Sequence, residues 1–206
     1  MTHAPHIILA SQSPQRSALL SQLGLPFTVD SVPMDEVIPP GLNPPEIVQQ
    51  LSRQKAQNYL TVRGVPHSDC GKLLLTADTI VVHSGRVMGK PSAREQAYEY
   101  LQALSGNVHT VFTGVCIIRL NRETGMDDHE KEIVLYDAAD VHMSTLSTAQ
   151  INHYLDTREW EGAAGGYRIQ GIGGGLIEGI SGAYPTVVGL PIHRIYGIVW
   201  QIVSAT

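Results

Sequence analysis

Apolar and polar positions alternate along this chain in a way that predicts short strands followed by helices. A short apolar run at 6–10 precedes Ser13 and Pro14, a good helix N-cap and a proline suited to the first helical position. Helical spacing continues over 15–23, and Gly24 is a typical helix end. The beginning of the chain therefore predicts a strand, a tight turn and a helix.

The rest of the chain continues this alternation. Asn43, Ser92 and Ser147 are expected N-caps, and the last two open capping boxes because Glu95 and Gln150 follow three residues later. We expect further strands at 27–32, 73–82, 108–120 and 132–143, and further helices at 45–60, 92–104, 147–155 and 193–203. Strands that alternate with helices, together with antiparallel hairpins, predict an α/β fold with a mixed sheet.

Length and composition narrow the possibilities. The 206 residues contain no internal repeat or long linker, so we expect one domain over 1–206, or two lobes about a cleft. Hydrophobic residues make up 43% and charged residues 16%, which favours a well-covered sheet. The net charge of −5 argues against nucleic acid or an anionic membrane as a partner. A small anionic ligand is still allowed, because a few cations can dominate locally.

Cysteine usage and the N-terminus bear on the compartment. Cys70 and Cys116 are too few and too far apart for a zinc framework, and they fit a reducing environment. The N-terminus lacks the basic region and the apolar run of a signal peptide. No apolar stretch reaches the ~20 residues that span a bilayer. The sequence thus predicts a cytoplasmic protein.

The most apolar expected strand, 73–82, carries a carboxylate at Asp78. Burying a carboxylate is costly unless it is protonated, paired with a cation or bound to a metal. If Ser84-Gly85 forms a hairpin turn, Thr79 faces Lys90, which brings this lysine within one residue of Asp78 in register. This arrangement indicates either a functional site or a structural ion pair.

Other positions supply cations and hydrogen-bond donors. Lys55 lies within the apolar stripe of the helix expected at 45–60, so it either extends past the core to solvent or meets an anion in a cleft. At the start of the first helix, the free amides and the positive dipole end attract phosphate or carboxylate. Ser11, Ser13 and Arg16 add donors at that place.

Two more segments complete the candidate chemistry. Asp35-Glu36 is either a solvated turn or, with Asp78, a site for magnesium. The glycines at 171–175 lack dinucleotide-fold spacing and indicate tight turns or a close approach of the backbone to a ligand. Together, the cations, carboxylates and helix N-terminus are what phosphoanhydride hydrolysis requires: charge neutralisation on several phosphates, a metal and a base for water.

Six ordered motifs, followed by Val188-Gly189-Leu190-Pro191, resemble those of a known family. They are Ile8-Leu9-Ala10-Ser11-Gln12-Ser13-Pro14-Gln15-Arg16, Asp35-Glu36, Arg53-Gln54-Lys55-Ala56, Ala77-Asp78-Thr79-Ile80-Val81, Gly89-Lys90-Pro91 and Gly166-Tyr167-Arg168-Ile169-Gln170-Gly171. The chain resembles the Maf family of nucleoside triphosphate pyrophosphatases from about residue 7 to residue 202. The order of the motifs makes this resemblance highly specific.

The resemblance implies a two-lobed α/β fold with a twisted mixed sheet, helices on its faces, a central cleft and a homodimer. It also implies metal-dependent cleavage of a nucleoside triphosphate to its monophosphate and pyrophosphate. In this family pattern Asp78 would activate water, and Glu36 and Asp78 would hold Mg²⁺ or Mn²⁺. The substrate phosphates would be bound by Ser11, Ser13, Arg16, Lys55 and Lys90.

Base choice in the family is tied to three positions, which here are Gln15, Thr79 and Gln170. Thr79 and Gln170 resemble the branch that acts on dTTP and UTP. Gln15 replaces the first arginine of the common Ser-Pro-Arg-Arg motif, which removes a positive charge, and Arg168 could partly replace that charge. Two alternatives stay open: the same chemistry on a purine such as inosine triphosphate or on 7-methyl-GTP, and a nucleotide-binding regulator of cell division with incidental catalysis.

Overall fold

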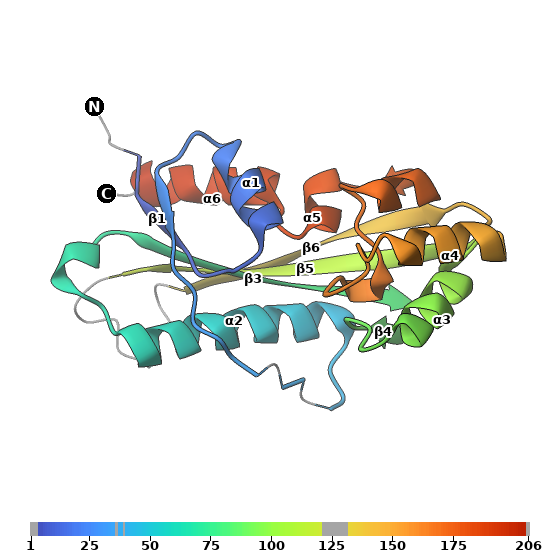
Figure 1. Cartoon of the computed structure of the whole chain (residues 1–206). Helices are drawn as coiled ribbons and strands as arrows, with labels where there is room; N and C mark the ends of the chain where they lie inside the picture. Colours follow the sequence, from blue (N-terminus) through green and yellow to red (C-terminus); the bar gives the residue numbers. More distant parts are fainter. Residues whose placement is uncertain (1–3, 36, 39, 121–131, 205–206) are drawn as a thin grey trace. The chain divides into compact units, whose positions relative to one another are not determined.

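The computed structural model describes residues 4–35, 37–38, 40–120 and 132–204. Seven strands in this part of the chain form one mixed sheet with helices packed on it (Figure 1). The residues form two compact units: the first takes its residues from 1–78, 113–136 and 189–206, and the second from 79–112 and 137–188. The predicted α/β class and mixed sheet are confirmed, whereas a central cleft stays a prediction.

The sheet contains both parallel and antiparallel pairs. Its strand order is β2-β1-β3-β5-β6-β7, with β4 paired to β3. β1 is parallel to β2 and to β3, whereas β4 is antiparallel to β3 and β7 is antiparallel to β6. The strands are β1 (Ile7–Leu9), β2 (Phe27–Val29), β3 (Leu73–His83), β4 (Arg86–Met88), β5 (Val108–Arg119), β6 (Glu132–Met143) and β7 (Ile177–Ser181). The long strands β3, β5 and β6 contribute residues to both units.

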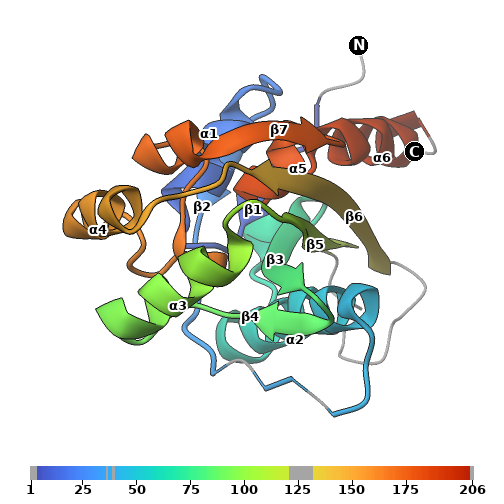
Figure 2. The same cartoon turned by 90° about the vertical axis from the view of Figure 1, so that its right-hand side faces the viewer.

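In the first unit, helices cover both faces of the strands. Helices α1 (Pro14–Ser21) and α6 (Ile192–Ser204) lie on one face, and α2 (Pro44–Arg63) lies on the other (Figures 1 and 2). A short 3₁₀ helix, η1 (His67–Asp69), leads into β3. Ala56 and Tyr59 of α2 pack against Ile8, Leu74 and Cys116 of the strands. Burial of this apolar face holds α2 in place.

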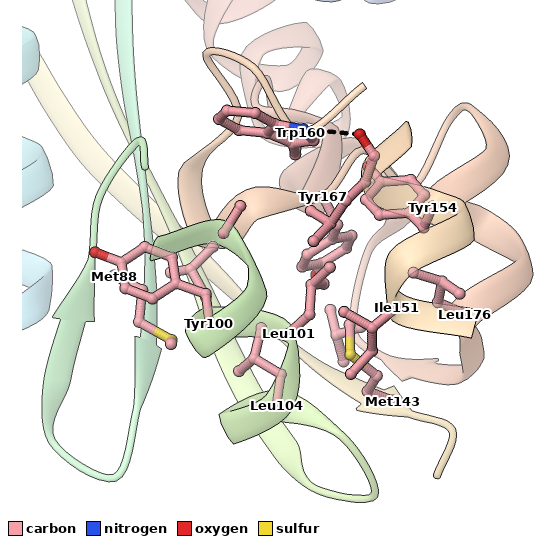
Figure 3. Packing of buried hydrophobic residues seen from close by; sticks show 14 of the residues in the cluster. Met88, Tyr100, Leu101, Leu104, Met143, Ile151, Tyr154, Trp160, Tyr167 and Leu176 are labelled. Atoms are coloured by element: carbon pink, nitrogen blue, oxygen red, sulfur yellow. Dashed lines mark hydrogen bonds between the residues drawn. The ribbon is translucent and has the colours of Figure 1, made fainter. Parts of the chain in front are cut away.

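The second unit has its own apolar core. Its helices are α3 (Arg94–Leu104), α4 (Thr148–Asp156), α5 (Tyr184–Val188) and the 3₁₀ helices η3 (Ala164–Gly166) and η4 (Ile172–Leu176). The core gathers aromatic and aliphatic side chains from α3, α4, the strands and the connection after α4, among them Leu101, Tyr154, Trp160 and Tyr167 (Figure 3). Trp160 Nε1 donates a hydrogen bond to the Leu155 carbonyl at 3.0 Å, so its polar atom is satisfied inside the core.

Most of the expected helix caps are confirmed, and one is wrong. Ser13, Asn43 and Ser147 are N-caps whose side chains accept backbone hydrogen bonds. Ser92 is not a cap, because α3 begins at Arg94 and Ala93 occupies the N-cap position without a side-chain bond. Ser92 instead donates through its backbone N and its Oγ to the Gln96 side chain.

Some boundaries also differ from expectation. The strand expected at 27–32 ends at Val29. The helix expected at 45–60 extends from Pro44 to Arg63 and ends at Gly64, whose φ of 65° a glycine adopts without strain. Within the described ranges, no helix combines the length and the apolar character that a bilayer span needs.

Candidate functional site

The turn between β1 and α1 is organised around two serines and an arginine. The Ser13 backbone N and Arg16 Nη1 both donate to Ser11 Oγ, at 3.2 and 3.3 Å. The Arg16 backbone N donates to Ser13 Oγ at 3.4 Å, which is the N-cap bond. Arg16 Nε donates to the Gly189 carbonyl at 2.9 Å, which ties this turn to the Val-Gly-Leu-Pro segment. The structure thus brings together Ser11, Ser13 and Arg16, as the sequence predicted.

Gln15 lies in the same turn. Its side-chain Oε1 accepts a hydrogen bond from Ser13 Oγ at 3.0 Å. A longer arginine at this position would add a charge here, whereas the amide of Gln15 binds the capping serine instead. The departure from the common motif therefore changes both the charge of the turn and its internal hydrogen bonding.

Asp78 lies buried in β3 and forms an ion pair with Lys55 of α2. Lys55 Nζ contacts Asp78 Oδ1, and the two side chains are only 19% and 7% exposed. Because side chains alternate along a strand, Thr76 faces the same way as Asp78, and its Oγ1 donates to the Ser52 carbonyl of α2 at 2.7 Å. α2 is thus fixed against this part of β3. The alternative in which Lys55 extends past the core to solvent is wrong.

The ion pair was not foreseen in this form. The sequence predicts that Lys90 of the hairpin lies near Asp78, and it leaves the partner of Lys55 open. In the structure, Asp78 pairs with Lys55. The signal was present, since Lys55 lies in the apolar stripe of α2 and Asp78 in an apolar strand. Two misplaced charges that face one core are expected to meet.

The hairpin after β3 has the predicted register. Val81 pairs with Met88 and His83 with Arg86. Ser84 and Gly85 both have positive φ, 49° and 75°, as a type I′ turn requires. Continuing this register places Thr79 opposite Lys90, which is exposed. A contribution of Lys90 to phosphate binding stays a prediction.

The segment that carries Gln170 belongs to the second unit and exposes the Gln170 side chain. The Tyr167 side chain points into the core, where its hydroxyl lies 2.7 Å from His109 Nε2. Arg168 Nε and Nη2 donate to the carbonyls of Glu159 and Glu161, at 2.9 and 2.7 Å. The Arg168 guanidinium therefore binds the backbone of a neighbouring loop, and its replacement of the missing charge at Gln15 stays a prediction.

His109 was overlooked in the sequence, although it stands at an inward position of an alternating strand. The residue is 2% exposed, and its Nδ1 has no hydrogen-bond partner among the described residues. Burial lowers the pKa of His109 to about 4, and His83 acts in the same direction. Burial also raises the pKa of Tyr167 above its usual range. Both groups are therefore neutral at pH 7 and act as a structural pair.

The predicted metal ligands are described only in part. Glu36 lies outside the described residues, and the neighbouring Asp35 is exposed. Within the described part of the chain, no three His, Cys, Asp or Glu side chains gather closely enough to hold a metal ion. Magnesium is commonly held by one or two carboxylates together with water and substrate phosphates. The carboxylate of Asp78 fits such a donor set.

The glycines at 171–175 form tight turns, as expected, because the Gly171 N–H donates to the Arg168 carbonyl at 3.2 Å and the Gly174 N–H to the Gly171 carbonyl at 3.0 Å. Two glycines shortly before this segment have left-handed backbone conformations. Gly165 and Gly166 have φ values of 70° and 76°. A Cβ at Gly165 would lie 3.0 Å from the Val81 side chain, and a Cβ at Gly182 would lie 2.9 Å from the Ala139 backbone. These glycines serve the close packing of the second unit. A close approach of the backbone at 171–175 to a ligand stays a prediction.

A family model and several individual proteins are similar to this chain over most of its length. A family model described as Maf-like protein matches residues 6–202. A protein of Pseudoalteromonas atlantica named dTTP/UTP pyrophosphatase is 44% identical over 189 residues, 91% of this chain and 92% of that protein. A protein of the same name from Pelotomaculum thermopropionicum is 41% identical, over 92% of this chain and 92% of that protein. Another, from Bacteroides thetaiotaomicron, is 40% identical over 93% of each chain.

Proposed function

Because this chain belongs to the Maf family, we propose that it is a nucleoside triphosphate pyrophosphatase that hydrolyses dTTP and UTP to the monophosphate and pyrophosphate. Similarity over more than nine tenths of the chain to proteins named for this activity supports the proposal. The observation that carries it is the buried ion pair between Lys55 of α2 and Asp78 of β3. The pair supplies a carboxylate base and a cation at one place.

The residues of the first unit have complementary roles in this reaction. Asp78 accepts a proton from the water that attacks the α-phosphorus. Lys55 supplies the positive charge that a buried carboxylate requires, and its ammonium group can share a phosphate oxygen when the substrate binds. Arg16, held by Ser11 and the Gly189 carbonyl, offers a guanidinium for the phosphates. These charges stabilise the negative charge that develops on the leaving pyrophosphate.

A divalent cation belongs to this proposal. Mg²⁺ or Mn²⁺, held by Asp78 and Glu36, would neutralise charge on the substrate phosphates. In the second unit, Lys90 is proposed to bind phosphate, and Thr79 and Gln170 to select the base together with Gln15. A homodimer, a cytoplasmic location and the absence of nucleic-acid or membrane partners belong to the same proposal. Light scattering coupled to size-exclusion chromatography tests the dimer directly.

The decisive experiment is a nucleotide panel with the purified full chain, with pyrophosphate and orthophosphate measured separately, with and without Mg²⁺ or Mn²⁺. We expect pyrophosphate release, fastest with dTTP and UTP. Orthophosphate as the sole product would exclude cleavage between the α- and β-phosphates. Saturable nucleotide binding without turnover would favour a regulator, and a preference for 7-methyl-GTP or inosine triphosphate would favour the other branch.

The variant Asp78→Asn tests the proposed base. The amide cannot accept the proton from water, so kcat should fall by roughly three orders of magnitude. Asp69→Asn is the matched control, because Asp69, the last residue of η1, is paired with Lys72 and has no proposed part in the reaction. A rate for Asp78→Asn close to that of the control would remove Asp78 from its proposed role.

A further inference from the structure

After Gln170 the chain folds back on itself very closely. A Cβ at Gly173 would lie 2.6 Å from the Arg168 carbonyl oxygen, and a Cβ at Gly174 would lie 2.5 Å from that of Ile169. Neither backbone oxygen can move away easily, so side chains at these two positions would open the turn. The position of Gln170 therefore depends on a compact backbone loop rather than on a regular helix or strand.

Glu159, from the loop after α4, binds the backbone of this turn. The Ile172 N–H donates to Glu159 Oε1 at 3.0 Å, and the Gly173 N–H donates to Oε2 at 3.2 Å. These are the first amides of η4, and amides in the first turn of a helix have no acceptor within that helix. A carboxylate that accepts both forms charge-assisted hydrogen bonds, which are stronger than neutral ones.

The glycine next to Gln170 makes this contact possible. A Cβ at Gly171 would lie 2.5 and 2.6 Å from the two carboxylate oxygens of Glu159. The carboxylate therefore lies directly beneath the backbone at Gly171. Any side chain there would push the Glu159 side chain aside, which a flexible glutamate can accommodate at small cost to the fold.

The loop that carries Glu159 is itself fixed from the other side. Arg168 donates to the carbonyls of Glu159 and Glu161, and the Arg168 backbone N donates to Tyr154 Oη at 3.1 Å. Trp160 is buried in the same core as Tyr154 (Figure 3). The loop at 159–161 and the turn at 168–173 are thus joined by hydrogen bonds of two kinds. Arg168 donates to carbonyls of the loop, and the Glu159 carboxylate accepts from amides of the turn.

The exposed side of the turn consists of Gln170, Gly171 and Ile172, while Gly173 is buried. We propose that Glu159 is a positioning residue for nucleotide selectivity, which fixes the backbone beneath Gln170 so that its amide meets the base in one orientation. This inference rests on the proposed function, in which Gln170 selects the base. Glu159 does not touch the substrate and acts through the amides of Ile172 and Gly173.

The test compares wild type, Glu159→Gln and Gly171→Ala in kcat and KM for dTTP, UTP and GTP. A glutamine keeps the size but turns one acceptor into a donor facing a backbone N–H. We expect the ratio of kcat/KM for dTTP to that for GTP to fall about tenfold, the order expected from losing one charge-assisted hydrogen bond, mainly through KM for dTTP. Gly171→Ala, which displaces the same carboxylate, should shift the ratio in the same direction.

Glu161→Gln is the matched control, because its carboxylate pairs with Arg158 at the surface. It should keep the wild-type ratio. Amide hydrogen exchange at residues 172 and 173 is a readout that does not depend on activity, and it should accelerate in Glu159→Gln but not in Glu161→Gln. An unchanged ratio, equal losses with all three nucleotides, or unchanged exchange would each overturn the inference. A wild-type chain that releases no pyrophosphate would instead defeat the proposed function and the role of Glu159 with it.

Discussion

At the scale of single residues, the main feature is a charge pair placed where the chain is otherwise apolar. Asp78 lies in β3 between Ala77 and Thr79, and Lys55 reaches it from α2. Two charges removed from water are costly to hold, so replacing such a pair with apolar residues is often neutral or stabilising. A pair of this kind is therefore easier to explain by chemistry than by stability.

This view predicts how the pair responds to mutation. Lys55→Met removes the cation and leaves Asp78 buried, so the free energy of unfolding should fall by about 2–3 kcal/mol. Adding Asp78→Asn to Lys55→Met should recover more than half of that loss, because the buried charge is then gone. Urea denaturation of wild type, the two single variants and the double variant measures this coupling. Strictly additive losses would show that the two side chains do not interact in solution.

The buried His109 predicts a dependence of stability on pH. Its pKa is lowered from 6.5 to about 4 in the folded state, so between these values the unfolded chain binds the proton more readily. Stability should therefore be full above pH 6.5 and should fall as the pH drops towards 4, by roughly 3 kcal/mol for this group. His83 and His142 near it favour its neutral form, and Asp140 opposes them.

His109→Gln isolates this effect, because an amide can still bind the Tyr167 hydroxyl but does not titrate. Chemical denaturation at pH 7.5, 6, 5 and 4.5 should show a smaller loss of stability in the variant than in wild type. His193→Gln on α6, which replaces an exposed histidine, should follow the wild-type curve. Parallel curves for wild type and His109→Gln would contradict the assignment.

At the scale of elements, β5 and α2 approach each other more closely than a side chain allows. A Cβ at Gly114 would lie 2.2 Å from the Val48 carbonyl oxygen of α2, within the backbone of that helix. Gly114→Ala should therefore lower the free energy of unfolding by about 3 kcal/mol or more, since a helix backbone must move. The same shift would displace Lys55, so activity should fall as well.

Gly197→Ala is the matched substitution with the opposite expectation. Gly197 lies within α6, and a Cβ there would meet nothing within 4 Å. Alanine should raise stability by about 0.5–1 kcal/mol, because glycine is less favourable than alanine inside a helix. Thermal denaturation of both variants shows directly whether each substitution lowers or raises the stability. A harmless Gly114→Ala would mean that α2 lies further from β5 than the structure shows.

How far the sequence predicts these elements depends on whether a signal is local. The caps at Ser13 and Ser147 and the turn at Ser84-Gly85 follow from neighbouring residues, and all three are confirmed. Ser92 misled because the helix begins one residue later than its capping pattern indicated. Gly114 looked like any small residue in an apolar strand, since nothing nearby in sequence reports that a distant helix crosses it.

The candidate site follows the same rule. Ser11, Ser13 and Arg16 belong to one turn, so their meeting could be predicted from their spacing. Lys55 and Asp78 were each recognised as misplaced charges, but their pairing required the fold. Glu159 gave no signal at all, because its role depends on amides that lie thirteen and fourteen residues further along the chain.

At the scale of the whole molecule, the net charge of −5 works against an anionic substrate. Local charge must therefore outweigh the global one. In the first unit Arg16 and Lys55 are both held in place by hydrogen bonds or an ion pair, which lowers the entropy lost when they bind phosphate. Lys90, Thr79 and Gln170, which the proposed function also assigns to the substrate, belong to the second unit.

Lys90→Met tests whether the second unit contributes to phosphate binding. The methionine keeps most of the apolar stem and removes the ammonium group, so kcat/KM for dTTP should fall by about 10- to 100-fold if Lys90 stabilises charge on the triphosphate. Lys72→Met is the control, because it makes the same substitution at a lysine whose ammonium pairs with Asp69 of η1 and which has no proposed part in the reaction. The loss should shrink for a nucleotide with fewer phosphates, since a cation that binds phosphate has less charge to neutralise there. Equal kinetics for Lys90→Met and Lys72→Met would place phosphate recognition in the first unit alone, with Arg16 and Lys55 as its cations.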